Sequence, residues 1–159
     1  MLRPDVRVDR LEPVTPDLLR SLGVRNALLD LDDTLVASDR DDAVADAPLT
    51  VERLKEAGFG VAILSNGKPE RVARAADLLG VPGVALAGQP FGWAFRRALA
   101  MLPGAVPANT AMVGDQLFTD VLGAKRAGLV TVLVRPLSEG KLLHTRLARR
   151  LERMILEEH

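Results

Sequence analysis

The sequence contains no cysteine and no tyrosine, and aromatic residues make up only 3% of its 159 positions. The absence of cysteine excludes a disulfide framework and a thiolate metal site. No apolar run is long enough to span a bilayer, and the N-terminal MLRPDVRVDR lacks the apolar segment of a secretory signal. Acidic and basic side chains balance at 21 each, so net charge predicts neither a nucleic-acid nor a membrane partner. These features predict a cytoplasmic globular protein.

Short apolar runs alternate with helical segments along the chain. The runs are continuous rather than alternating, which is typical of parallel strands buried on both faces. They cover residues 26–31, 60–64, 84–87, 110–113 and 130–134. The helical segments between them cover about 49–57, 69–79, 92–101 and 119–127. This order predicts an α/β fold: a three-layer α/β/α Rossmann-like sandwich around a five-stranded parallel sheet.

The two ends are less regular than the middle. Residues 1–23 form an N-terminal lead-in segment that contains a short helix, with Thr15 as its cap and Pro16 at its first position. Residues 142–157 predict an amphipathic helix with an arginine-rich polar face. Because no linker or low-complexity stretch divides the chain, we expect one domain over residues 1–159.

Polar residues follow each predicted strand at the point where it ends. In an open parallel sheet these carboxyl ends meet along one edge, where ligands bind. The residues expected there are Asp30, Asp32, Thr34, Ser65, Asn66, Gly67, Lys68, Gln89, Asp115 and Asp120. Such a concentration of carboxylates is costly without a hard cation, and ligands that are all oxygen favour Mg²⁺. The sequence therefore predicts a magnesium site at this edge.

Three of these segments resemble known motifs. DLDDTLV, which starts at Asp30, is similar to the first motif of the haloacid dehalogenase (HAD) superfamily. SNG after the second strand resembles the second motif of that superfamily, and GDQLFTD resembles the fourth. The motifs occur in the expected order over nearly the whole chain. Together with the terminal arginine-rich helix, these segments resemble more closely a small capless branch called YqeG-like. Some relatives of that branch dephosphorylate phosphatidylglycerophosphate at mitochondrial membranes.

The resemblance implies a phosphohydrolase with an aspartyl-phosphate intermediate. Asp30 is the implied nucleophile, and Asp32 is the implied acid and base that protonates the leaving oxygen and then activates water. The implied Mg²⁺ ligands are the Asp30 carboxylate, the Asp32 carbonyl and Asp115, with Asp120 binding or orienting a ligand. The implied substrate-binding residues are Thr34, Ser65, Asn66, Gly67 and Gln89.

One position departs from the family pattern. The third motif usually supplies a lysine, often followed by proline, whereas this sequence has Gly-Gln-Pro with Gln89 at that place. A neutral amide donates hydrogen bonds but cannot replace the charge of an ammonium group. Lys68, three residues after Ser65, is a candidate to supply that charge; the alternative is a surface lysine that precedes a helix.

The spacing also bears on the substrate. Residues 34–65 and 65–89 hold one helix each, which leaves no room for the cap domain that many relatives insert there. An open site suits a phosphate carried by something large, such as a protein or a lipid headgroup, or a small substrate if an oligomer neighbour covers the mouth. Any membrane contact would be peripheral, through the basic tail.

Other functions stay open on the sequence alone. The chain is either an active phosphatase or a binding module that kept its carboxylates and lost turnover with the lysine. A phospho-acceptor signalling domain of the receiver type shares the sheet plan, but it carries its acidic pair and its acceptor aspartate after different strands. Taken singly, Asp30, Ser65 and Asp115 are also ordinary turn or capping residues.

Overall fold

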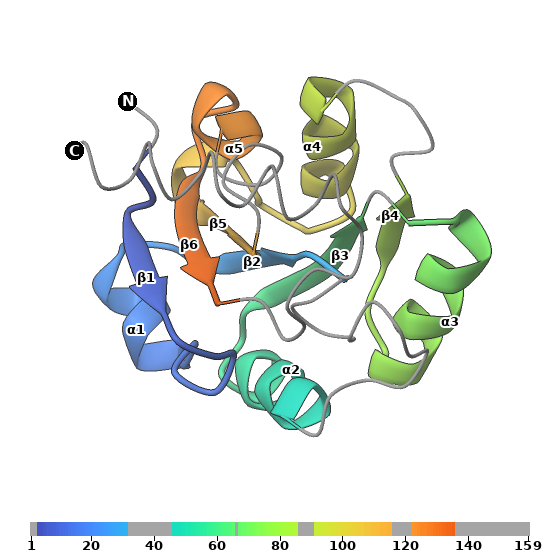
Figure 1. Cartoon of the computed structure of the whole chain (residues 1–159), viewed down its shortest axis with the longest axis horizontal. Coiled ribbons are helices and arrows are strands. Elements are labelled where there is room, and N and C mark those ends of the chain that lie inside the picture. The colour runs from blue at the N-terminus through green and yellow to red at the C-terminus, as the bar shows by residue number, and fades with distance from the viewer. Residues whose placement is uncertain (1–2, 32–45, 66, 86–90, 116–121, 136–159) are drawn as a thin grey trace.

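A computed structural model describes residues 3–31, 46–65, 67–85, 91–115 and 122–135 (Figure 1). Six parallel strands form one sheet in the order β1-β6-β5-β2-β3-β4. The strands are β1 (Val6–Val8), β2 (Asn26–Leu29), β3 (Gly60–Ser65), β4 (Gly83–Ala85), β5 (Thr110–Gly114) and β6 (Val130–Val134). The helices are α1 (Pro16–Ser21), α2 (Asp46–Glu56), α3 (Pro69–Leu79), α4 (Phe91–Ala100), the 3-10 helix η1 (Pro107–Asn109) and α5 (Leu122–Arg126).

Helices cover both faces of the sheet. Consecutive residues of a strand point to opposite faces, so each central strand contributes side chains to the core on both sides. In β2, Ala27 and Leu29 join a core cluster that includes residues of α1, α2 and α3. Leu28 between them joins a second cluster built with α4 and α5. Figure 1 shows α4 and α5 together on one side and α2 on the other. The predicted three-layer α/β sandwich is confirmed.

The predicted strand count was wrong by one. Residues 6–8 form β1, a sixth strand that pairs in parallel with β6 at the edge of the sheet. The Val-Arg-Val run is too short and too mixed with charge to resemble the continuous apolar core strands. It is fastened by Asp5, whose N–H donates to the Thr131 hydroxyl at 2.9 Å and whose carboxylate accepts from the Thr131 N–H at 2.8 Å. The lead-in segment is thus partly a strand.

Local sequence determines where the best-defined helices begin and end. The Thr15 hydroxyl caps α1 by accepting the Leu18 N–H at 3.1 Å, as predicted, and Pro16 follows at the first position. Helix α3 begins at Pro69 and ends at Gly80, which adopts the left-handed conformation at φ 66°. Both predicted ends of α3 are therefore confirmed.

Helix α3 packs closely against the edge strand β4. A Cβ atom added to Gly83 would lie 2.9 Å from Val72 Cγ1 and 3.2 Å from Ala76 Cβ. Only glycine at this position lets the helix come so near, since real Cβ atoms do not approach other atoms that closely. The first two turns of α3 are consequently held against the sheet.

The predicted tail helix over 142–157 lies outside the described residues. Among the residues that the structure does describe, no helix is long and apolar enough to cross a membrane.

Candidate active site at the carboxyl edge of the sheet

The strand order reverses at the centre of the sheet. From β2 the chain moves outward through β3 and β4, then returns to the other side of β2 to form β5 and β6. A reversal of this kind creates a crevice at the carboxyl ends of the two strands that flank it. Here those strands are β2 and β5, which are followed by Asp30 and Asp115. The topology therefore brings together the first and fourth motifs of the sequence.

Asp30 and Asp115 are buried neighbours at this point. In the β2–β5 ladder Leu29 pairs with Val113, and the Asp30 N–H extends the ladder by donating to the Val113 carbonyl at 2.9 Å. Asp30 is 7% exposed and Asp115 is 3% exposed. Burying a carboxylate costs several kcal/mol unless partners or a cation compensate. Two buried carboxylates on adjacent strands form an arrangement that attracts cations.

Ser65 ends the neighbouring strand and is 1% exposed. Its hydroxyl accepts the Gly67 N–H at 3.0 Å, which fixes the turn between β3 and α3. Ser65 and Gly67, both predicted to bind substrate, are thus joined by a hydrogen bond at the same edge of the sheet as Asp30.

Lys68 precedes α3 as its N-cap residue. Its carbonyl accepts the N–H groups of Arg71 and Val72 at 3.0 and 3.1 Å, while its side chain makes no capping hydrogen bond. The side chain is exposed, so it lies at the rim of the edge rather than in its interior. Lys68 is therefore three residues from Ser65 in sequence, and its side chain extends into solvent.

Half of the predicted site lies outside the described residues. These positions are Asp32, Thr34, Asn66, Gln89 and Asp120. Within the described part of the chain, no three acidic, histidine or cysteine side chains gather closely enough to hold a metal ion. Asp30 and Asp115 fit a divalent cation as two of its ligands, because both are carboxylates held on adjoining strands. The remaining predicted ligands are among the residues not described.

One cation near this edge was missed by the sequence reasoning. Arg71 lies in the first turn of α3. Its side chain is partly buried, whereas every other arginine in the described ranges is exposed. Its Nε atom is shielded from solvent. A detectable signal existed, because a basic residue in the first turn of a helix opposes the helix dipole and calls for a local reason.

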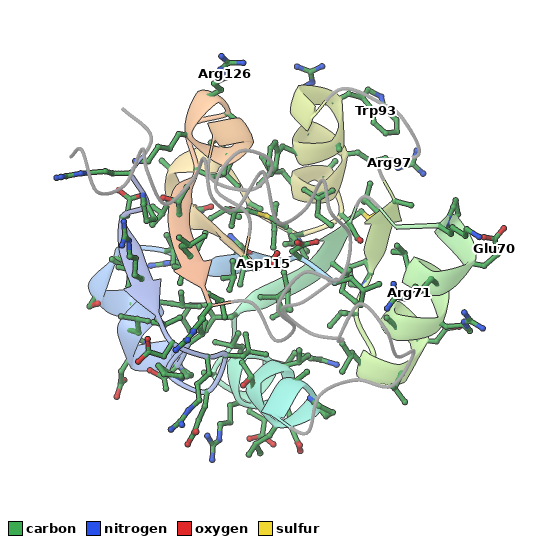
Figure 2. All side chains as sticks on the ribbon, in the orientation of Figure 1. Glu70, Arg71, Trp93, Arg97, Asp115 and Arg126 are labelled. Atoms are coloured by element: carbon green, nitrogen blue, oxygen red, sulfur yellow. The ribbon has the colours of Figure 1, made fainter. Side chains whose placement is uncertain are left out.

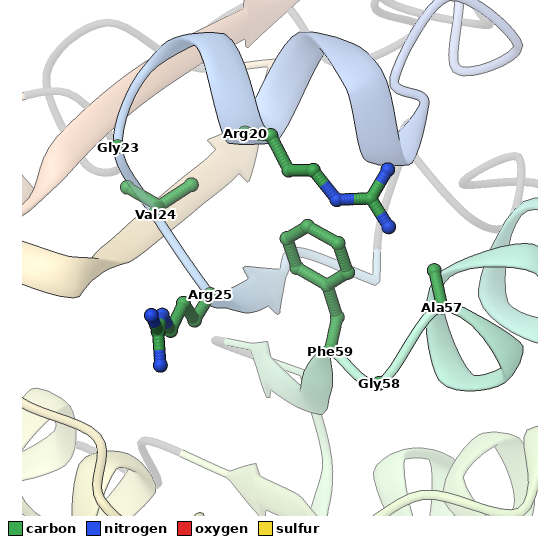
Figure 3. Close-up of a pocket in the computed structure, with 7 residues that line it drawn as sticks. All are labelled: Arg20, Gly23, Val24, Arg25, Ala57, Gly58 and Phe59. Atoms are coloured by element: carbon green, nitrogen blue, oxygen red, sulfur yellow. The ribbon is translucent and has the colours of Figure 1, made fainter.

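A separate hollow of about 550 Å³ lies at the opposite, amino edge of the sheet. Its wall comes from the residues that precede β2 and β3: Arg20, Gly23, Val24, Arg25, Ala57, Gly58 and Phe59 (Figure 3). The Arg20 guanidinium stacks 5.7 Å from the centre of the Phe59 ring and bonds Asp17 at 3.1 Å. Figure 3 shows Arg25 directed away from Arg20, so the two cations do not converge on one ligand.

Comparison with known proteins agrees with the motifs. Residues 6–128 match the family described as haloacid dehalogenase-like hydrolase. The chain belongs to the HAD-like hydrolase family. This HAD-like hydrolase is 38% identical over 153 residues to the probable phosphatase YqeG of Bacillus subtilis (strain 168). The aligned region covers 96% of this chain and 88% of that relative.

Solved HAD structures share the fold of this family member. A HAD-like hydrolase from Porphyromonas gingivalis superposes with a TM-score of 0.58 at 15% identity, over 79% of this chain and 98% of that one. The cobalt-bound deoxy-D-mannose-octulosonate 8-phosphate phosphatase from Haemophilus influenzae gives 0.55 at 17% identity, over 80% and 75%. At such identities the likeness extends to the fold alone.

Proposed function

We propose that this HAD-like hydrolase is a Mg²⁺-dependent phosphomonoester hydrolase that works through an aspartyl-phosphate on Asp30. The observation that carries the proposal is the pair of buried carboxylates, Asp30 and Asp115, at the reversal point of the sheet. The 38% identity to a probable phosphatase along most of both chains supports the reaction class. Asp30 is on a rigid strand end, which suits a nucleophile that must be aligned with phosphorus.

The reaction would have two steps. A carboxylate oxygen of Asp30 attacks phosphorus, the bond from phosphorus to the ester oxygen breaks, and Asp32 gives that oxygen its proton. Asp32 then takes a proton from water, whose oxygen attacks the aspartyl-phosphate and releases inorganic phosphate and the Asp30 carboxylate. Ser65 and the amides of Asn66 and Gly67 would hold phosphate oxygens, and Thr34 and Gln89 would line the same site.

Mg²⁺ is the cation we propose for the site. Asp30, the Asp32 carbonyl and Asp115 would hold it, with Asp120 binding or orienting a ligand. Bound there, it would offset the negative charge of carboxylates and phosphate that otherwise repel each other. The HAD phosphatase from Haemophilus influenzae was solved with cobalt, which supports a divalent metal in this family.

The test is hydrolysis of 4-nitrophenyl phosphate by the purified chain with Mg²⁺ and with EDTA. We expect activity with Mg²⁺ only, and a loss of at least about a thousandfold in Asp30→Asn, because the amide is a poor nucleophile. A melting curve of the Asp30→Asn variant checks that it is folded. Turnover that survives either EDTA or Asp30→Asn would rule out this mechanism.

A second function is favoured by one observation, the neutral Gln89 in place of the third-motif lysine. The alternative is a weakened HAD-like module that binds phosphate without turnover. Gln89→Lys separates the two proposals. We expect it to raise an existing turnover about tenfold by restoring one charge. If the wild type shows no turnover and Gln89→Lys does, the weakened module is favoured instead.

The substrate we propose is a phosphate on something large or lipid-linked, for which the YqeG-like resemblance suggests phosphatidylglycerophosphate. A single capless domain over 1–159 would leave the mouth of the site open to such a molecule. A small substrate would instead suit a homo-oligomer in which a neighbouring subunit covers the mouth. Hydrolysis of phosphatidylglycerophosphate in mixed micelles, compared with 4-nitrophenyl phosphate, tests this assignment. Equal kcat/KM for both would contradict a lipid preference.

A further inference from the structure

Negative charge at the carboxyl edge raises the question of which described cation lies near it. Asp30 and Asp115 are both buried there, and a phosphate monoester brings up to two more negative charges. Exposed cations are screened within about 8–10 Å at physiological salt, whereas partly buried ones are screened much less. An effective counter-charge for this edge should therefore be a cation that is withdrawn from solvent.

Among the described basic residues, only Arg71 and Lys125 are partly buried; all others are exposed. Lys125 lies at the opposite edge, because its ammonium is 3.7 Å from the carboxylate of Asp5, which precedes β1 at the amino edge of the sheet. Of these two residues, Arg71 is the partly buried cation on the side of the proposed active site.

The placement of Arg71 directs it toward that site. Three residues separate the end of β3 from the start of α3, so the first turn of α3 lies at the carboxyl edge. Helical side chains lean toward the N-terminus of their helix, which carries the Arg71 side chain back toward this edge. Figure 2 shows Arg71 on the side of α3 that faces the middle of the molecule, where Asp115 lies, while Glu70 points outward.

Placing Arg71 in the first turn of α3 and partly burying it costs folding free energy, and a fully exposed arginine would avoid the desolvation part of that cost. A cation in the first helical turn is unfavourable by about 0.3–1 kcal/mol because of the helix dipole. Shielding the Nε atom from water adds a desolvation cost. A guanidinium offers a planar fork of donors that matches two phosphate oxygens at once, which an ammonium cannot do.

We infer that Arg71 binds the phosphoryl group of the substrate and is the principal protein cation of the active site, with the exposed Lys68 contributing less. This inference rests on the proposed phosphatase function. It assigns to Arg71 contact with oxygens of the same phosphate that Ser65 would bind.

The experiment compares Arg71→Met and Arg71→Lys with the wild type. The matched control is Arg74→Met, which removes an exposed arginine from the next turn of the same helix. Two readouts are needed: kcat and KM for 4-nitrophenyl phosphate with Mg²⁺, and binding of inorganic phosphate with Mg²⁺ by titration calorimetry. The second readout requires no turnover.

We expect Arg71→Met to lower kcat/KM about a hundredfold, as loss of one preorganised donor does in other enzymes. Phosphate affinity should fall at least about tenfold, with Arg71→Lys intermediate and Arg74→Met unchanged. If Arg71→Met does not fold, Arg71→Lys carries the test, because it keeps the charge and most of the volume while losing the fork.

The outcomes separate this inference from the function on which it rests. If Arg71→Met or Arg71→Lys keeps wild-type phosphate affinity while Asp30→Asn abolishes turnover, the Arg71 inference is wrong and the phosphatase stands. If the wild type hydrolyses no ester but binds phosphate through Arg71, the inference stands and the catalytic proposal falls. If the wild type binds no phosphate at all, the Arg71 inference is overturned.

Discussion

The two edges of the sheet use polar residues in opposite ways. At the amino edge, Asn109 accepts from the Val106 N–H at 2.8 Å and from the Asn26 amide at 3.1 Å, and donates to the Gly104 carbonyl at 3.1 Å. At the carboxyl edge, Asp30 and Asp115 place two carboxylates of the same sign in the interior. Neutral groups that hydrogen-bond one another stabilise a fold, whereas carboxylates buried on adjacent strands carry charges that repel each other. The amino edge thus stabilises the fold, whereas the carboxyl edge is the one that we propose binds ligand.

The largest expected effect on stability is at the amino edge. Asn109→Ala removes several hydrogen bonds and leaves the buried Asn26 amide only the backbone carbonyl of residue 109, at 3.5 Å, which should cost about 2–3 kcal/mol of unfolding free energy. Urea denaturation measures the loss, and kcat of the folded fraction should stay at the wild-type value. A drop in kcat without a loss of stability would break the division between the edges.

Lys68→Ala tests the rim of the carboxyl edge. We expect kcat/KM to fall about tenfold at low salt, because one cation near the phosphate is lost. The effect should shrink as salt is added, since Lys68 is exposed and its field is screened. Steady-state kinetics at two ionic strengths, with Arg126→Ala as a remote control, checks this. Unchanged hydrolysis in Lys68→Ala would remove Lys68 from the site.

Asp115→Asn should have the smallest effect on stability and the opposite sign from Asn109→Ala. In EDTA the change removes one of two buried carboxylates, so we expect unfolding free energy to rise by about 1 kcal/mol. Thermal melts with and without Mg²⁺ measure it, and the Mg²⁺-dependent stabilisation of the wild type should be reduced in the variant. Destabilisation in EDTA would mean that Asp115 serves the fold.

The central sheet was predictable from the sequence because its strands are continuous apolar runs. The same logic predicted that Asp30, Ser65 and Asp115 would follow strands at one edge; Asp30 and Asp115 do so, and Ser65 is the last residue of β3 at that edge. Strand β1 was missed because pairing with β6 and the Asp5–Thr131 contacts, rather than its own three residues, define it.

Arg71 was missed for a different reason. The sequence gives its place in a helix, but whether an arginine is in solvent depends on how that helix lies against the sheet. Asp32, Thr34, Asn66, Gln89 and Asp120 stay predictions, because they are outside the described residues.

The close approach at Gly83 has a consequence for the timing of events during catalysis. Because Val72 and Ala76 pack against β4 without an intervening side chain at Gly83, we expect helix α3 to keep its position on the sheet when a ligand arrives. The first turn of α3 would then already be in its final position. The ordering entropy is spent when the chain folds, so a phosphate would meet a rigid receptor that needs no closure on that side.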